Sequence, residues 1–456
     1  MEERALTDAD ITRKGAGAIQ QRCLGLSAGN HFVLLLDETT LEVLDPLWLA
    51  AKDLDVQLTT LFYSRLQQMT IQDLGSPATR IIDDADAALL AHSDAAECSR
   101  FRTQLVSKWR GTTRLGTMPG ASRFILESAA EMNDQFIVDQ CRKLTLPLLN
   151  GRGCVITTFD QAGRPYELHF TLGGIMRIPV QSTGVLGPHA WGNVPSGEIF
   201  TAPLESSAEG DYLVNGAIGT LSLKGSEAVL TFREGRLVQH RLLPGTGAVP
   251  HLDNIARLSK SRHDNNWNVI AEFGIGVNEG IREVTGSTLL DEKMFGSVHI
   301  AVGNNIGWQG ENDAQIHLDI ITKAPTVTID GKVIIANGRH VVRPEEFDDL
   351  SDYEPHPAFR WPDNAPIAEM LRDNIRRDDH GQFRIALNTQ SGRVTEVPIA
   401  NERTRHLVSQ LLRLTAERST PSVRLLDSDG EPLSQAHLTK FLSLLRAYGL
   451  VKPDLE

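Results

Sequence analysis

The spacing of apolar residues changes near residue 186, and this change restricts the chain to a fold with at least two parts. Before it, apolar runs alternate with helix-like stretches, which predicts an α/β domain with a largely parallel sheet over residues 1–185. The first strand, helix and strand are expected in HFVLLLD (31–37), LEVLDPLWLAAKDL (41–54) and VQLTTLFY (56–63).

Two further apolar runs repeat the pattern in this N-terminal domain. ADAALLAHS (85–93) and CVITTFD (154–160) are expected as strands of the same sheet, and LESAAEMNDQFIVDQCRKLTLPLL (126–149) as a helix between them. No GxGxxG loop follows the first strand, so the sequence gives little support for a dinucleotide site.

After residue 186 glycine becomes frequent and apolar residues alternate with polar ones. Examples are YLVNGAIGTLSLKG (212–225) and AVLTFREGRLVQH (228–240). Strict alternation is typical of strands with one buried face. We therefore expect a β-rich (α+β) domain over residues 186–340.

A third unit is expected at the C-terminal end. Residues 341–380 are acidic and proline-bearing, which suits a linker. In residues 381–456, FRIAL and VTEVP flank the turn NTQSGR as a hairpin, and two helices with leucine stripes follow. This order predicts a small winged-helix-like module. Because it has no basic recognition face, docking of a peptide or protein is favoured over DNA binding.

Composition excludes some partners. The formal net charge of −13 over 456 residues argues against nucleic acid, since binding a polyanion depends on excess Lys and Arg. The four cysteines, Cys23, Cys98, Cys141 and Cys154, have no metal-type spacing and are expected as core thiols. No apolar leader or membrane-length apolar run occurs, so a cytoplasmic protein without membrane contact is expected.

The stretch QIHLDIIT (315–322) carries a chelating pattern. Side chains alternate on a strand, so His317 and Asp319 are expected on one face and Leu318 and Ile320 on the other. Imidazole and carboxylate both bind divalent transition metals. Taken alone, the pair could equally be an ordinary hydrogen-bonded couple.

Three more residues complete the candidate set. His299 lies among apolar neighbours in SVHIAVG, Glu272 in VIAEFGIGVN, and Glu198 directly after a Pro-Ser-Gly turn. An unpaired carboxylate in apolar sequence is costly. Together with His317 and Asp319 the set carries a charge of about minus three, which two dications convert to plus one. This charge balance applies only if the five residues converge in space.

Three segments resemble the M29 (aminopeptidase T/S-like) metallopeptidases in their amino-acid sequence and in their order along the chain. They are GNVPSGEIFTAPLESSAEG (192–210), AEFGIGVNEGIREVTGSTLLDEKMFGSVHIAVGNN (271–305) and IHLDIITKAPTVTIDGKVI (316–334). With the MPG of Met118–Gly120, the resemblance covers about residues 25–340. The C-terminal unit is outside it.

The resemblance implies a metal-dependent aminopeptidase. It implies two divalent ions, with zinc or cobalt first and manganese or iron as alternatives, and a peptide substrate in a homodimer. Glu272 matches the metal-binding and catalytic glutamate of E-x-G-I/L-G-x-N. The implied metal ligands are Glu198, Glu272, His299, His317 and Asp319.

Two alternatives stay open. Several family members have a tyrosine a few residues beyond the histidine of H-I-A-x-G, but here that stretch reads NNIGWQGEND (304–313). Another metal-dependent reaction, or a non-catalytic peptide-binding role, would accommodate its absence. A hydroxypyridine-cleaving iron dioxygenase group shares the scaffold, but it resembles a variant with histidine at the position of Glu272.

Overall fold

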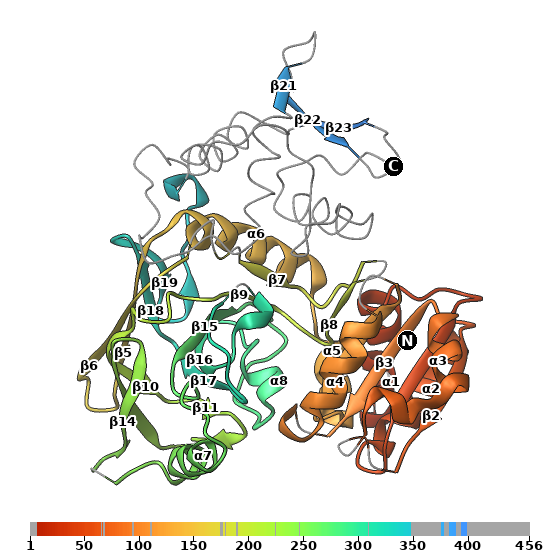
Figure 1. Ribbon diagram of the computed structural model, residues 1–456, viewed down its shortest axis with the longest axis horizontal. Helices are drawn as coiled ribbons and strands as arrows, with labels where there is room; N and C mark the ends of the chain where they lie inside the picture. The colour runs from red at the N-terminus through yellow and green to blue at the C-terminus, as the bar shows by residue number, and fades with distance from the viewer. Residues whose placement is uncertain are drawn as a thin grey trace, which may run out of the picture.

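The computed structural model describes residues 7–347, apart from 65, 67–68, 94, 110–111, 174–176, 178, 188–189, 224, 246 and 309, together with three strands within 375–398. An N-terminal α/β unit, red and orange in Figure 1, stands beside a larger β-rich unit coloured yellow to teal. The long helix α6 (Asp134–Asn150) lies along one end of the β-rich unit.

The N-terminal unit is built on a five-stranded sheet in which every strand pairs in parallel. The expected parallel sheet is thus confirmed. In spatial order the strands are β2 (Gln57–Phe62), β1 (His31–Leu36), β3 (Ala87–His92), β4 (Arg114–Pro119) and β8 (Trp191–Asn193).

Helices cover both faces of this sheet. On β1, Phe32 and Leu34 belong to one buried cluster and Val33 and Leu35 to another, so no face of the strand reaches solvent. This explains why the strand is a continuous apolar run. The helices are α1 (Asp8–Ala18), α2 (Leu44–Asp53), α3 (Gly75–Asp83), α4 (Ala95–Trp109) and α5 (Arg123–Ala130).

The single helix expected over residues 126–149 is two helices. Helix α5 ends at Ala130, and α6 starts after Asn133, whose side chain accepts a hydrogen bond from the backbone N–H of Phe136. An asparagine at this position satisfies an N–H that would otherwise have no partner, and so starts a new helix.

The β-rich unit consists of two antiparallel sheets. The eight-stranded sheet has the order β14 (Arg236–Leu243), β13 (Glu227–Arg233), β10 (Glu209–Val214), β6 (Pro165–Thr171), β5 (Gly153–Phe159), β18 (Thr326–Ile329), β19 (Lys332–Ala336) and β20 (Arg339–His340). The seven-stranded sheet has the order β12 (Leu221–Ser222), β11 (Ala217–Ile218), β17 (His317–Lys323), β16 (Ser297–Gly303), β15 (Ile270–Gly276), β9 (Glu198–Thr201) and β7 (Val180–Ser182). Helices α7 (Pro250–Ser261) and α8 (Thr288–Asp291) accompany them.

The strand around Cys154 was expected in the parallel sheet, and this expectation is wrong. It is β5, which pairs antiparallel with β6 and β18 in the eight-stranded sheet. Buried and more accessible residues alternate along β5, whereas every residue of β3 is buried. Alternation of this kind is typical of an antiparallel sheet with one covered face.

The two antiparallel sheets share one apolar core. Phe170 on β6 packs against Phe273 on β15 with ring centroids 5.1 Å apart. The buried Tyr212 on β10 donates its hydroxyl to the carbonyl oxygens of Val298 and Ile320, at 3.4 and 3.2 Å. One face of the seven-stranded sheet is therefore filled by this core, which leaves the opposite face for polar side chains.

The described part of the C-terminal region is a three-stranded antiparallel sheet, β21 (Ile375–Arg377), β22 (Phe383–Asn388) and β23 (Val394–Pro398). The hairpin expected from FRIAL and VTEVP is confirmed, with Ile385 opposite Val397. The two helices expected after it lie outside the described residues, so the winged-helix assignment stays a prediction.

Two sequence expectations about side chains and membranes can be compared with this fold. Cys23, Cys141 and Cys154 are buried free thiols, as expected. Within the ranges described above, no helix has both the length and the apolar character needed to cross a bilayer.

Candidate metal centre

His317 and Asp319 project from the face of β17 that the core leaves open. Their neighbours Leu318 and Ile320 are buried toward the other side. His317 Nε2 lies 3.2 Å from Asp319 Oδ1, while its Nδ1 bonds to the Asn304 carbonyl oxygen at 2.8 Å. The carbonyl fixes the orientation of the ring, as a second-layer acceptor does for a metal-binding histidine.

Strand register brings the other candidates to the same face. Ala301 on β16 is opposite Asp319, so His299, two residues earlier, shares its face. Glu272 on β15 is opposite the same Ala301, and Glu198 on β9 is opposite Gly276, four residues beyond Glu272. Directly paired residues of a ladder point to one side of the sheet. The structure therefore brings all five candidates together.

Two glycines on β15 make this convergence sterically feasible. A Cβ atom at Gly274 would lie 2.1 Å from the His299 ring, and one at Gly276 would lie 2.1 Å from the Met294 carbonyl oxygen. The His299 imidazole thus lies across the backbone of β15. The spacing E-x-G-x-G in the sequence has a packing reason, since any side chain at either glycine would displace a neighbour.

The candidate donor atoms form two groups that share Glu272. In the first, His299 Nε2 lies 3.1 Å from Glu272 Oε1 and 3.7 Å from Glu198 Oε2. In the second, His317 Nε2 lies 3.5 Å from Glu272 Oε2 and close to Asp319. Within each group the donor atoms are all within 4.8 Å of one another. One Glu272 oxygen faces each group, which is the arrangement of a bridging carboxylate.

The carboxylates and imidazoles shift one another's pKa strongly. Burial would lower the pKa of His299, but Glu272 and Glu198 raise it to about 9. Burial likewise opposes protonation of His317, yet Asp319 raises its pKa to about 10. The pKa of Asp319 lies well below its usual range because His317 outweighs burial, whereas burial raises that of Glu272. Without metal, this is a set of buried charges that compensate one another.

A buried lysine and a further glutamate belong to the centre, although neither was predicted from the sequence as a site residue. Lys293 has no exposed surface, and its Nζ lies 3.0 Å from Glu198 Oε1 and in contact with Glu292. Burial raises the pKa of Glu292, which hydrogen-bonds Asp319. The signal was present in the sequence: TLLDEKMFG places three charges in a short apolar segment directly before β16. Buried charges in such a context require partners.

A buried oxygen atom without a hydrogen-bond partner supports a metal site here, independently of which residue types line it. Glu198 Oε2 is buried and has no hydrogen-bond partner among the described residues, although Oε1 of the same carboxylate is paired. A buried acceptor without a partner costs about 1–3 kcal/mol, so a ligand is expected to complete it. Imidazole and carboxylate donors suit Zn, Co, Mn and Fe dications.

An aromatic side chain covers the centre. Trp308, in the short helical turn Ile306–Trp308 after β16, contacts the His317 ring edge to face at 4.9 Å between centroids. It contacts Phe200 on β9 in the same manner at 5.7 Å. Phe200 and Glu198 are two residues apart on one strand and share a face. The indole thus lies over the polar face between β17 and β9.

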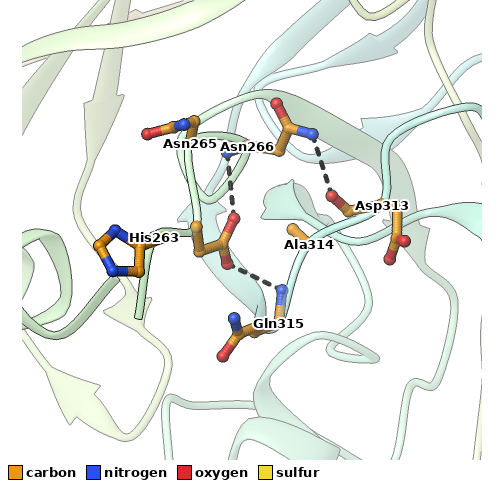
Figure 2. A pocket seen from close by; sticks show the side chains of 7 residues that line it. His263, Asn265, Asn266, Asp313, Ala314 and Gln315 are labelled. Atoms are coloured by element: carbon orange, nitrogen blue, oxygen red, sulfur yellow. Dashed lines mark hydrogen bonds between the residues drawn. The ribbon is translucent and has the colours of Figure 1, made fainter. Parts of the chain in front are cut away.

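A polar pocket of about 390 Å³ lies beside the same loop, and none of the five candidate residues lines it. Figure 2 shows that polar groups lining this pocket form hydrogen bonds with one another. The Asp264 carboxylate accepts from the backbone N–H of Asn266 and of Gln315, at 3.0 and 2.8 Å. The Asn266 amide donates to the Asp313 carbonyl oxygen at 3.0 Å. These bonds attach the loop after β16 to the segment that follows α7.

Comparison with known proteins agrees with a metallopeptidase type of centre. The family model described as thermophilic metalloprotease (M29) matches residues 180–342, a range that contains all five candidates. The resemblance seen in the sequence is thereby confirmed for this part of the chain. No curated protein matches the chain in sequence.

Two solved structures are similar in fold. The 2,5-dihydroxypyridine dioxygenase from Pseudomonas putida KT2440 has a TM-score of 0.53 at 17% identity, covering 74% of this chain and 99% of the other. Wild-type AmpT from Thermus thermophilus has a TM-score of 0.49 at 16% identity, covering 73% and 99%. At such identity the first likeness shows a shared fold and leaves the reaction to be argued from the residues.

Proposed function

We propose that this protein is a metal-dependent aminopeptidase that removes the N-terminal residue of a peptide. The observation that carries the proposal is the pair of donor groups sharing Glu272 on one sheet face, within the segment that matches the M29 family model. A carboxylate shared by two ligand sets could bring two ions as close together as they are in two-metal hydrolytic sites. In the proposal, both groups take a divalent ion, zinc or cobalt first.

The chain's own residues have separate roles in this proposal. Glu198 and His299 would hold one ion and His317 and Asp319 the other, with Glu272 shared by the two donor groups. The chemistry supplied by bound divalent ions is Lewis-acid polarisation of a carbonyl and a lowered pKa of water. For proton transfer one Glu272 oxygen would stay free of metal. That oxygen would take the proton of the attacking water and return it to the leaving amine, a role that suits a buried carboxyl with a raised pKa.

The substrate end is proposed from the ligands that divalent ions accept. A peptide N-terminus carries an α-amine that would approach a bound dication. Once deprotonated, that amine is a neutral nitrogen donor, whereas an internal amide nitrogen is not. Cleavage is therefore proposed at the first peptide bond.

The proposal is tested with matched peptides that carry either a free or an acetylated N-terminus. Metal-loaded protein should release the first amino acid from the free peptide only, and chelation should abolish the release. Glu272→Gln should lower kcat by roughly 10²–10⁴, the usual contribution of a general base. The exposed Glu167→Gln serves as the control. Equal cleavage of the acetylated peptide, or full activity of a metallated Glu272→Gln protein, would contradict the proposal.

The second candidate function is that of a ring-cleaving oxygenase. Its support is the similarity in fold to the 2,5-dihydroxypyridine dioxygenase. A non-haem iron oxygenase site of the common type has two histidines and one carboxylate around one iron. Here the second donor group has one histidine, His317, with Glu272 and Asp319. Oxygen uptake with 2,5-dihydroxypyridine and ferrous iron would favour this reading over peptide hydrolysis.

Three further features belong to the proposal: a homodimer, action in the cytoplasm, and docking of a peptide or protein by residues 381–456. Light scattering of the purified protein measures the first. The second follows from an expected set of free thiols. The third is addressed by truncation in the Discussion.

A further inference from the structure

The indole of Trp308 carries a hydrogen-bond donor that the protein leaves unused. Its Nε1 is buried, and no described residue accepts from it. Tryptophan has this N–H as its single polar group and can only donate. A buried donor is nearly always paired, so this N–H is available to an acceptor from solvent or from a ligand.

The position of the ring limits what that acceptor can be. Trp308 contacts the His317 ring, whose Nε2 faces Glu272 and Asp319. It also contacts Phe200, on the strand face that carries Glu198. The donor therefore belongs to a side chain packed on the ligand set itself.

The loop that carries Trp308 is held firmly. The amide of the buried Asn305 donates a hydrogen bond to Glu205 Oε1 at 2.9 Å. The guanidinium of the buried Arg177 donates to both carboxylate oxygens of Glu205. Asn312, on the other side of the turn, donates its backbone N–H to Asn305 Oδ1 at 2.8 Å and its amide to the Gly303 carbonyl oxygen at 2.6 Å. A donor on such a loop is placed before the substrate arrives, which is the condition for electrostatic stabilisation at low reorganisation cost.

We propose that the Trp308 indole N–H donates a hydrogen bond to the carbonyl oxygen of the scissile bond and stabilises it as it gains negative charge. The inference rests on the proposed peptidase function and adds a catalytic residue to it. As the water oxygen bonds to the carbonyl carbon, the π electron pair of the C=O bond moves onto the carbonyl oxygen. The pair returns when the C–N bond breaks and the amine leaves with the proton carried by Glu272. The N–H proton stays on the indole throughout.

The test compares Trp308→Phe, which keeps a ring and removes the N–H, with Trp267→Phe, a control at another half-buried tryptophan. Trp308→Phe should lower kcat roughly 100-fold, as loss of one oxyanion donor does, with KM and metal content little changed. Trp308→Ala should additionally raise KM, because the wall over His317 is lost. If Trp308→Phe keeps the wild-type kcat, the inference is wrong and the ring is only a wall.

A binding measurement tests the same bond without turnover. Acetohydroxamate presents charged oxygens to metal-loaded protein, and calorimetry should show it binding about tenfold more weakly to Trp308→Phe than to wild type or Trp267→Phe. Equal affinity, or no binding to wild type, overturns the inference. Absence of peptide cleavage by wild type together with the tenfold loss would reject the proposed function and retain the donor role of Trp308.

Discussion

Lys293 places its ammonium nitrogen 3.0 Å from Glu198 Oε1, and neither side chain is more than slightly exposed. The same ammonium contacts Glu292. One oxygen of Glu198 is therefore held by a permanent cation, and the other, Oε2, is left unpaired toward His299. This pairing makes Glu198 a one-oxygen donor of fixed orientation.

Replacing this cation should destabilise the metal-free protein strongly. Lys293→Met leaves two buried carboxylates without their partner, and breaking a buried ion pair from one side costs about 3–5 kcal/mol. Urea unfolding measures the free energy of unfolding, with the exposed Lys260→Met as the control. A loss below about 1 kcal/mol would show that the pair is unimportant for the fold.

Removing either member of the H-x-D pair should lower metal content. His317→Ala and Asp319→Ala each delete a donor from the second group, while the first group keeps Glu198, Glu272 and His299. Elemental analysis after dialysis should find about one ion fewer per chain than in wild type. The exposed His169→Ala should retain the wild-type content. Unchanged metal in both variants would refute the assignment of the second group.

Metal uptake should depend on pH through the two histidines. With pKa values of about 9 for His299 and about 10 for His317, both are protonated in metal-free protein at neutral pH. A metal binds neutral imidazole, so loading should release about two protons per chain and tighten as the pH rises from about 6 to 8. Calorimetry in buffers of different ionisation enthalpy counts the protons. An affinity independent of pH would contradict this expectation.

The same shifts predict how the metal-free fold responds to pH. Both histidines have folded pKa values above the ordinary 6.5, so their contribution to stability is complete below about pH 6.5. It is lost as the pH rises through about 9 and 10. Unfolding of metal-free protein should therefore become easier in alkali, and the effect should disappear in His299→Gln and His317→Gln.

Truncation separates the C-terminal module from the centre, and the cut must respect the core. Phe347 is 4% exposed and belongs to the main apolar cluster. A chain ending at Phe347 should keep its metal and its activity on aminoacyl amides, and lose affinity for long peptides if residues 381–456 dock them. A chain ending at Gly338 should lose about 3–5 kcal/mol of stability, as expected for deleting a buried phenylalanine. Equal handling of long peptides by the longer truncation would exclude docking.

Local patterns in the sequence were sufficient for much of the fold and for pairing His317 with Asp319, whereas the set of five candidate ligands came from the family resemblance. Alternation along QIHLDIIT placed His317 and Asp319 on one face, because side chains on a strand alternate whatever the strand's partners are. The alternation of apolar runs such as β1 with helix-like stretches predicted the largely parallel sheet of the N-terminal unit. The helical pattern over residues 126–149 did not separate α5 from α6, since an N-cap asparagine inside such a pattern is a weak signal.

Contacts between distant segments decided the rest. Sequence could not say that β5 pairs with β6 and β18 and not with the parallel strands, because pairing depends on which edge a strand meets in space. In the sequence Lys293 is one charge among several. Only the fold places its ammonium group next to Glu198, which lies 95 positions earlier in the chain. Trp308 likewise became a candidate only when the loop after β16 placed it against His317 and Phe200. Side-chain type and spacing are local properties, whereas burial and partnership arise from the packing of the whole chain.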